Sequence, residues 1–338
     1  MRPLYRMRKK KTTFKPFVLS FAAVVMISPL RIVFMGTPAF AVPSLQALLD
    51  GPDDVAAVVC RADSPQGRGR KCCSPPVKTL AEQAGIPVLQ PDSIRTDEFF
   101  ETIQAVQADL AVVIAYGKIL PGRLLRLPRL GTINVHGSLL PKYRGAAPIQ
   151  RALLNGERET GVTIMQMDEG IDTGDILLPA RLPISDEDTS ASLAEKLAWL
   201  GSETLLEAIT RLKAGQLPPT KQDETQATYA PMLAKEEGHL DWNKSAAELH
   251  CLIRGFDPWP SAYSFIDNRR FRFFQPQVVP GLVGEPPGTL CRADCQGILV
   301  ATGRDYLLMK EIQPEGKKRM CVQACICGMK LPVGERFT

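Results

Sequence analysis

The feature that most constrains the fold is the alternation of short apolar runs with helical patterns between residues 30 and 135. The run 110–114 is apolar at every position, as expected of a strand that a parallel sheet buries on both faces. Helical patterns separate such runs, and strands and helices in alternation pack as a doubly wound sheet. The pattern predicts strands at 30–35, 55–60, 110–114 and 131–135, and helices at 40–49, 77–84 and 99–106. The expected fold class is therefore α/β, with a mostly parallel, Rossmann-like sheet.

The loop after the first predicted strand argues against a nucleotide cofactor. It contains Gly36 but none of the further glycines that let a backbone wrap a pyrophosphate. A long amphipathic helix at 193–212 is expected to complete this part of the chain.

A different pattern begins after a proline-containing, mostly polar stretch at residues 215–232, which is typical of a linker. Short strand-like runs then alternate with turns between 262 and 312, which predicts a small antiparallel β-barrel. Ser245 and Glu248 have the spacing of a capping box at a helix start. The predicted organisation is a leader at 1–29, a catalytic domain at 30–214, the linker at 215–232 and a second domain at 233–338.

The candidate site lies where the strand at 131–135 ends. Asn134 and His136 are followed by a loop that Gly137, Pro141 and Gly145 keep irregular. Open α/β sheets bind ligands at such strand ends. An acidic turn at 168–175 follows about 25 residues later, and an imidazole, a carboxamide and a carboxylate together suit an acyl transfer.

The residues around the His136 motif resemble one family closely. An isolated histidine at a strand end is more often structural than catalytic, but the run 134–151 and the run 161–175 resemble the methionyl-tRNA formyltransferases. The resemblance extends from residue 30 to about 336. It implies formyl transfer from 10-formyltetrahydrofolate, a formyl-donating cosubstrate, to methionyl initiator tRNA, and an OB-like second domain.

The resemblance also assigns roles to residues of the two runs. It implies a catalytic set of Asn134, His136 and Asp172, whereas Asp168 and Asp175 are expected to be turn or cap residues. It implies that folate is contacted by Ser138, Leu139, Leu140 and Pro141, and it implies no metal.

A loop rich in glycine, proline and positive charge occupies residues 61–76. Its composition predicts a mobile surface loop, and an isolated basic run is more often a solvated turn than a binding site. The family's corresponding loop enters the tRNA acceptor stem, so the resemblance implies tRNA binding by Arg68, Arg70 and Lys71. The sequence departs from the family pattern at Ala62 and Ser64, where Pro and Arg are common, which puts the shape of the loop in doubt.

Charge is distributed unevenly along the chain. The formal net charge is +5, but all seven charged side chains before Arg31 are basic, so the remainder is slightly acidic. The leader is interpreted first as the product of a translation start upstream of the true one, near Met26. The alternatives are a mitochondrial transit peptide and a membrane-associating arm. We expect a cytoplasmic monomer without stable membrane association, or a mitochondrial protein if the leader is a transit peptide.

The nine cysteines contain no C-x-x-C pair and are odd in number, which favours free thiols over a disulfide framework. His239 and His250 lie in the second domain and are interpreted as structural.

Two other functions compete with the leading one. A formyltransferase for an amino sugar nucleotide would share the catalytic set, but the basic loop argues against it. A catalytically idle tRNA- or folate-binding module would share the fold, but the intact catalytic set argues against that.

Overall fold

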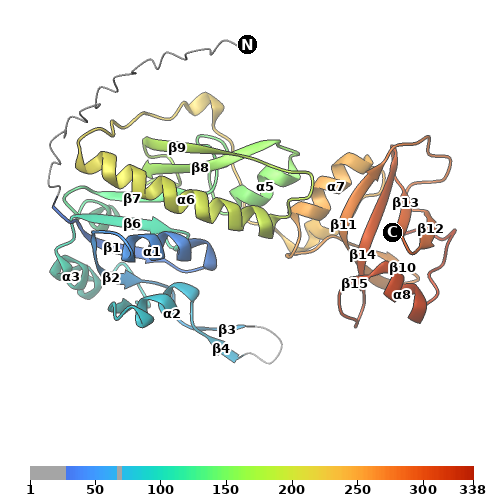
Figure 1. Cartoon of the computed structure of the whole chain (residues 1–338), viewed down its shortest axis with the longest axis horizontal. Coiled ribbons are helices and arrows are strands. Elements are labelled where there is room, and N and C mark those ends of the chain that lie inside the picture. Colours follow the sequence, from blue (N-terminus) through green and yellow to red (C-terminus); the bar gives the residue numbers. More distant parts are fainter. Residues whose placement is uncertain (1–27, 67–70) are drawn as a thin grey trace, which may run out of the picture.

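A computed structural model describes residues 28–66 and 71–338 of the chain. They form two parts, a large mixed sheet covered by helices and a smaller curled antiparallel sheet, joined side by side along the long axis of the molecule (Figure 1). The leader prediction falls almost entirely on residues 1–27, which lie outside the described residues.

The first sheet has seven strands in the order β5-β2-β1-β6-β7-β8-β9. Strands up to β7 pair in parallel, and the pairings β7–β8 and β8–β9 are antiparallel. All residues of β6 and β7 are buried, as the apolar run predicted. The strands are β1 (Arg31–Gly36), β2 (Asp54–Val59), β5 (Val88–Leu89), β6 (Leu110–Ile114), β7 (Thr132–His136), β8 (Glu159–Gln166) and β9 (Ile176–Pro183). The predicted α/β class is confirmed.

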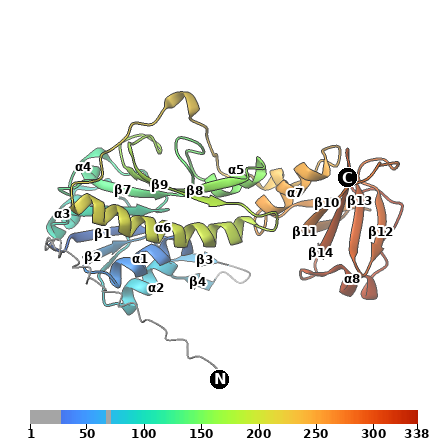
Figure 2. The ribbon, with the colours of Figure 1, turned by 45° about the horizontal axis from the view of Figure 1, so that its top comes forward.

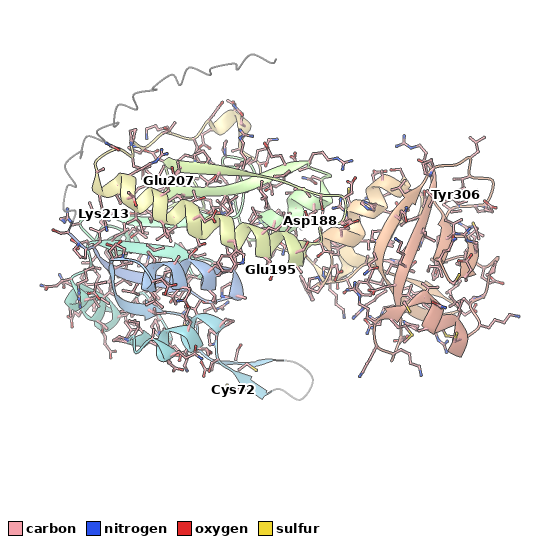
Figure 3. The ribbon with its side chains drawn as sticks, viewed as in Figure 1. Cys72, Asp188, Glu195, Glu207, Lys213 and Tyr306 are labelled. Atoms are coloured by element: carbon pink, nitrogen blue, oxygen red, sulfur yellow. The ribbon has the colours of Figure 1, made fainter. Side chains whose placement is uncertain are left out.

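Helices cover both faces of this sheet (Figure 2). One face packs against α1 (Val42–Leu49), α2 (Pro76–Gln83), α5 (Pro148–Leu154) and the long α6 (Ser190–Lys213). The other packs against α3 (Asp97–Val106) and the short α4 (Gly122–Leu125). In Figure 3, Glu195 and Glu207 mark the length of α6, and Lys213 marks its end, where it is ion-paired with buried Asp53 beside β2. Among the helices of the described ranges, none combines the length and the apolar character that crossing a membrane requires.

The loop predicted at residues 61–76 contains a two-stranded hairpin, β3 (Ser64–Gln66) and β4 (Lys71–Cys73). It projects away from the large sheet, and Cys72, in the middle of β4, marks it in Figure 3. Asp63 fixes the base, since it accepts hydrogen bonds from Lys78 Nζ at 2.9 Å and Gln90 Nε2 at 2.8 Å. The tip, with Arg68 and Arg70, lies outside the described residues.

The second part is an antiparallel sheet in the order β10-β11-β14-β13-β12, with β15 added on β14. Residues 334–338 join its two edges, because Leu290 N donates to Glu335 O at 2.9 Å and Thr338 N donates to Phe265 O at 2.8 Å. This C-terminal segment completes the curl, and the predicted OB-like, barrel-like class is confirmed. The elements are α7 (Ala246–Gly255), β10 (Tyr263–Ile266), β11 (Arg269–Val279), β12 (Leu290–Asp294), β13 (Gly297–Ala301), β14 (Tyr306–Pro314), β15 (Met320–Cys321) and α8 (Val322–Gly328).

The predicted capping box opens α7. Ser245 Oγ accepts from Glu248 N at 3.3 Å, and Glu248 Oε2 accepts from Ser245 N at 2.9 Å. At the other end of this helix, buried Arg254 reaches the first part and donates to the carbonyl oxygens of Ser185 at 3.0 Å and Asp188 at 2.9 Å. The two parts are therefore joined by hydrogen bonds as well as by chain connection.

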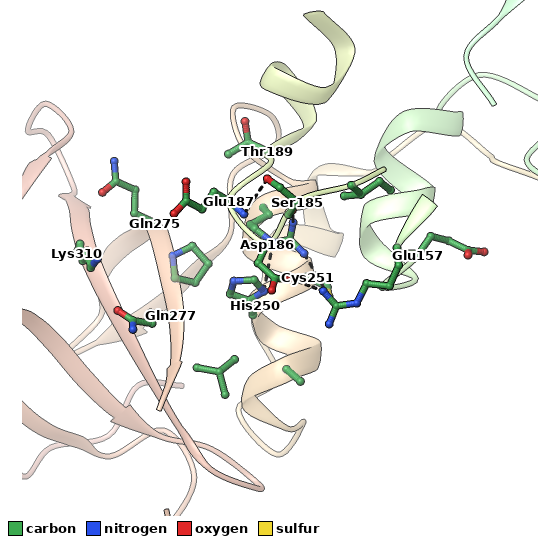
Figure 4. Close-up of a pocket in the computed structure, with 17 residues that line it drawn as sticks. Glu157, Ser185, Asp186, Glu187, Thr189, His250, Cys251, Gln275, Gln277 and Lys310 are labelled. Carbon is green, nitrogen blue, oxygen red and sulfur yellow. Dashed lines mark hydrogen bonds and ion pairs between the residues drawn. The ribbon is translucent and has the colours of Figure 1, made fainter. Parts of the chain in front are cut away.

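A cavity of about 900 Å³ lies at this joint (Figure 4). His250 and Cys251 of α7, Asp186 beyond β9, and Gln277 and Lys310 of the second sheet surround it. Burial, followed by the nearby Arg254 charge, lowers the pKa of His250 to about 4, so this imidazole is neutral near pH 7. That agrees with a structural role, in which His250 Nδ1 accepts from Arg254 Nε at 3.2 Å.

Candidate active site

The alternation of side chains along β7 brings Asn134 and His136 to one face of the sheet. Residues two apart on a strand point the same way, and the intervening Val135 belongs to the core on the opposite face. Asn134 pairs with Val113 of β6, and His136 is the last residue of the strand. Both are almost enclosed, with 8% and 6% of their surfaces exposed. The prediction that both lie where the strand gives way to a loop holds for His136, which ends β7. Asn134 lies within the strand, two residues before its end.

Both ring nitrogens of His136 face oxygen atoms. Nε2 lies 2.9 Å from the carbonyl oxygen of Tyr143, and Nδ1 lies 3.6 Å from Oδ1 of Asp172. A carbonyl only accepts, so Nε2 carries the hydrogen in the neutral imidazole. A flipped ring would put carbon atoms against both oxygens, which supports this orientation. Nδ1 is therefore the nitrogen that is free to gain and lose a proton.

Asp172 lies in the acidic turn with a left-handed backbone, at φ 54°. Its Oδ2 accepts from Gly145 N at 2.8 Å, while Oδ1 faces His136. The loop after His136 thus bonds to the imidazole through Tyr143 and to the carboxylate through Gly145. The structure brings Asp172 and His136 together across 36 residues of sequence.

The carboxamide of Asn134 is the third group. Within residues 28–66 and 71–338 its side chain has no hydrogen-bond partner. Among the described residues, the fully enclosed polar side-chain atom without a partner is the Tyr116 hydroxyl, so the Asn134 carboxamide still reaches solvent and is accessible to a substrate.

The other two aspartates of the acidic turn have structural contacts. Asp168 Oδ1 accepts from Gly170 N at 3.0 Å and from Thr173 Oγ1 at 2.7 Å, as expected of a turn residue. Asp175 lies 3.6 Å from Lys221, which is almost fully exposed. Within the described part of the chain, neither carboxylate forms an ion pair with His136.

The run predicted to contact folate forms a tight turn. The Ser138 hydroxyl is fully buried and donates to Lys142 O at 2.6 Å, and Thr163 Oγ1 donates to Ser138 O at 2.7 Å. Leu140 is also buried, whereas Leu139 and Pro141 are half-buried. These contacts occupy the Ser138 hydroxyl, and the folate contact of the run stays a prediction.

Sequence reasoning missed Arg144 and Gln222, both of which touch the catalytic loops. Arg144 is 1% exposed although it is charged, and Gln222 belongs to the predicted linker. No local signal set Arg144 apart, because the same loop also contains charged Lys142, and the partners of Arg144 lie about 80 residues away.

Within the described ranges, no three His, Cys, Asp or Glu side chains are arranged to hold a metal ion. Burial raises the pKa of the Cys60 thiol to about 11.

Comparison with known proteins places both parts of the chain in one family. Residues 30–209 match the model of the family "Formyl transferase", and residues 232–330 match "Formyl transferase, C-terminal domain". The methionyl-tRNA formyltransferase of Desulfotalea psychrophila is 57% identical over 302 residues, covering 89% of this chain and 94% of that protein. The one of Geobacter sulfurreducens is 46% identical over 308 residues, covering 91% and 96%.

Solved structures share the fold at low identity. HypX from Aquifex aeolicus in complex with tetrahydrofolic acid has a TM-score of 0.60 and 18% identity, covering 88% of this chain and 47% of that one. An N-formyltransferase from Helicobacter canadensis, in complex with folinic acid and dTDP-3-aminofucose, has a TM-score of 0.62 and 19% identity, covering 86% and 100%.

Proposed function

The chain belongs to the methionyl-tRNA formyltransferase family, and from this premise we propose that it transfers the formyl group of 10-formyltetrahydrofolate to the amino group of methionyl initiator tRNA. The observation that carries the proposal is the arrangement around His136. A carboxylate lies 3.6 Å from its ring, and the carboxamide of Asn134 on the same strand face has no partner among the described residues. Acyl transfer to an amine needs these three groups, because it develops an oxyanion and moves a proton.

Asn134 is proposed to stabilise the oxyanion. Its NH₂ group donates to the formyl oxygen as that oxygen becomes negative, an interaction of about 3 kcal/mol in comparable sites. Since the carboxamide has no other partner among the described residues, it need not break a bond to do so.

His136 is proposed to move the proton. As the amine nitrogen bonds to the formyl carbon, Nδ1 takes the proton that the amine loses. Nδ1 then returns this proton to N10 of the folate as the bond between N10 and the formyl carbon breaks. Meanwhile Nε2 keeps its hydrogen bond to Tyr143 O, which fixes the ring. The carboxylate of Asp172 lies 3.6 Å from Nδ1, beside the proton that this nitrogen carries between the two steps.

Substrate binding is assigned by family resemblance. We propose that Ser138, Leu139, Leu140 and Pro141 contact the folate donor through their main chain and through the half-buried Leu139 and Pro141. We propose that Arg68, Arg70 and Lys71, in the basic stretch at 61–76, bind tRNA. The chain beyond its leader is slightly acidic, so a polyanion must be held by local basic surface.

The organisation of the whole chain remains part of the proposal. It comprises a catalytic domain at 30–214, a connecting segment at 215–232 and a second domain at 233–338, acting as a monomer. Because its proposed acceptor is a charged initiator tRNA, we place its activity in the cytoplasm, where translation begins.

One experiment tests the reaction and its acceptor. The protein is given a labelled formyl donor with charged initiator tRNA, charged elongator tRNA or an amino sugar nucleotide. We expect transfer to the initiator tRNA at a rate at least about tenfold above the other two. Faster labelling of the amino sugar nucleotide would contradict the proposal, and absence of labelling with all three would contradict formyl transfer.

A further inference from the structure

The segment between the two domains contacts the catalytic loop directly. Arg144 N donates to Thr228 O at 2.8 Å, and Ala230 N donates to Arg144 O at 2.7 Å. Tyr143 N donates to Thr228 Oγ1 at 2.9 Å. The loop that bonds to His136 and Asp172 is therefore fixed along its outer side by residues whose composition resembles that of a free linker.

Gln222 in this segment bonds to the turn that carries Asp172. Its Nε2 donates to the carbonyl oxygens of Asp172 at 2.8 Å and Gly174 at 2.7 Å. Its Oε1 accepts from Nε of Arg144 at 3.1 Å and from Nη2 at 2.9 Å. Carbonyls only accept and guanidinium groups only donate, so the amide has one possible orientation, and both of its N–H groups are used.

Arg144 is held in turn by Glu224. The guanidinium is almost completely buried and donates to both carboxylate oxygens of Glu224, at 2.9 and 2.7 Å. This pairing raises the pKa of Arg144, so the buried group stays charged. A buried charge needs such a partner. With its guanidinium held by Glu224, Arg144 in turn holds the side-chain oxygen of Gln222 in place.

The contact with Gln222 matters because Asp172 has an unfavourable backbone conformation. A left-handed φ of 54° is less favourable than a right-handed one outside glycine, although Asp adopts it more readily than most residues, so bonds to the backbone of the turn help to hold it. Gln222 binds the carbonyl of Asp172 itself and the carbonyl two residues later. The position of the Asp172 carboxylate opposite His136 thus depends on this amide.

We propose that Gln222 is a positioning residue for formyl transfer, which acts by holding Asp172 in place beside His136. The inference rests on the proposed function, since it assumes that Asp172 serves the reaction. The segment between the domains is then part of the catalytic site, and Arg144 and Glu224 orient Gln222.

Two substitutions distinguish a role in holding the Asp172 turn from a role in pairing with Arg144. Gln222→Met keeps the size of the side chain and removes all four hydrogen bonds. Gln222→Glu keeps an acceptor for Arg144 but loses both donors to the turn. Displacement of a catalytic group by about 1 Å costs on the order of a hundredfold, so we expect both variants to lower kcat by about 10- to 100-fold. The KM values for both substrates should stay within about threefold.

Gln226→Met is the matched control. Gln226 lies in the same segment and is exposed, and its side chain donates to Asp223 Oδ2 at 2.8 Å. It should retain kcat within about twofold. Wild-type kcat in Gln222→Glu but not in Gln222→Met would show that Gln222 serves only to pair with Arg144, and would overturn the proposal.

A double-variant cycle with Asp172→Asn tests whether Gln222→Met lowers kcat through Asp172. It also distinguishes this route from a general loss of packing. If Gln222 acts through Asp172, Gln222→Met should cost less than about threefold when Asp172 is already Asn. The same 10- to 100-fold loss in both backgrounds would overturn the proposal. An Asp172→Asn protein as active as the wild type would instead contradict the catalytic assignment, so the two failures are distinguishable.

Discussion

Replacement of Asp172 by Asn tests the charge in the catalytic set with little change of shape. The amide oxygen of the new side chain can still accept from Gly145 N, so the loop contact at 2.8 Å survives. What disappears is the negative charge 3.6 Å from His136 Nδ1.

The size of the effect follows from Coulomb's law. Unit charges at the 3.6 Å separation of Asp172 and His136 attract by about 5 kcal/mol at an effective dielectric constant of about 20, and by about 1 kcal/mol in water. The Asp172 side chain is 17% exposed, so the value lies between these limits. Since a rise of about 1.4 kcal/mol in the activation free energy slows a reaction about tenfold, kcat should fall by about 10- to 1,000-fold.

The assay is single-turnover formyl transfer with saturating donor and charged initiator tRNA, from pH 5 to pH 9. Asp168→Asn is the matched control, because Asp168 belongs to the same turn and its carboxylate, among the described residues, bonds to Gly170 N and Thr173 Oγ1. It should stay within about threefold of the wild type. The reasoning is refuted if Asp172→Asn retains more than about a third of wild-type kcat, or if the control loses as much.

The remaining predictions concern the other catalytic residues, the basic hairpin and the domain joint. His136→Ala and Asn134→Ala should each lower turnover at least about a hundredfold with native-like circular dichroism, and more than a tenth of wild-type turnover in His136→Ala would contradict its role. Arg68→Ala should weaken use of methionyl-tRNA, while folate binding is unchanged. It should also flatten the plot of log affinity against log salt by somewhat under one unit. Equal slopes for the variant and the wild type would show that this loop is a solvated turn that does not bind tRNA. Because the pKa of His250 is lowered from 6.5 to about 4, its contribution to stability is complete above pH 6.5 and is lost as the pH falls toward 4. Denaturant unfolding should show a loss of about 1–2 kcal/mol over this range, after allowance for solvent screening, and a smaller loss in His250→Gln; identical pH profiles would contradict it.

The sequence by itself determined the features that depend on local periodicity. The apolar run at 110–114 became the buried strand β6, and the capping box of Ser245 and Glu248 formed as its spacing indicated. The two-residue spacing of Asn134 and His136 placed both on one face of β7, because a strand alternates its side chains whatever packs around it.

Other predictions went beyond local physics and came from family resemblance. Nothing in the spacing of Asp168, Asp172 and Asp175 says which carboxylate faces the imidazole. The resemblance singled out Asp172, and the structure places that residue beside His136. The hairpin of β3 and β4 and the helix α8 were not predicted, since short strands and a cysteine-rich helix have weak local patterns.

Only the tertiary structure decided how the catalytic loops are held. Residues 215–232 have the composition of a linker because their polar side chains could equally well be solvated. In the fold Gln222 and Glu224 bond instead to Arg144, about 80 residues earlier in the chain. Local patterns do not encode such contacts, which exist only after the chain has closed long loops and excluded water around the buried guanidinium. The same holds for residues 334–338, which complete the second sheet by pairing with strands that only folding brings beside them.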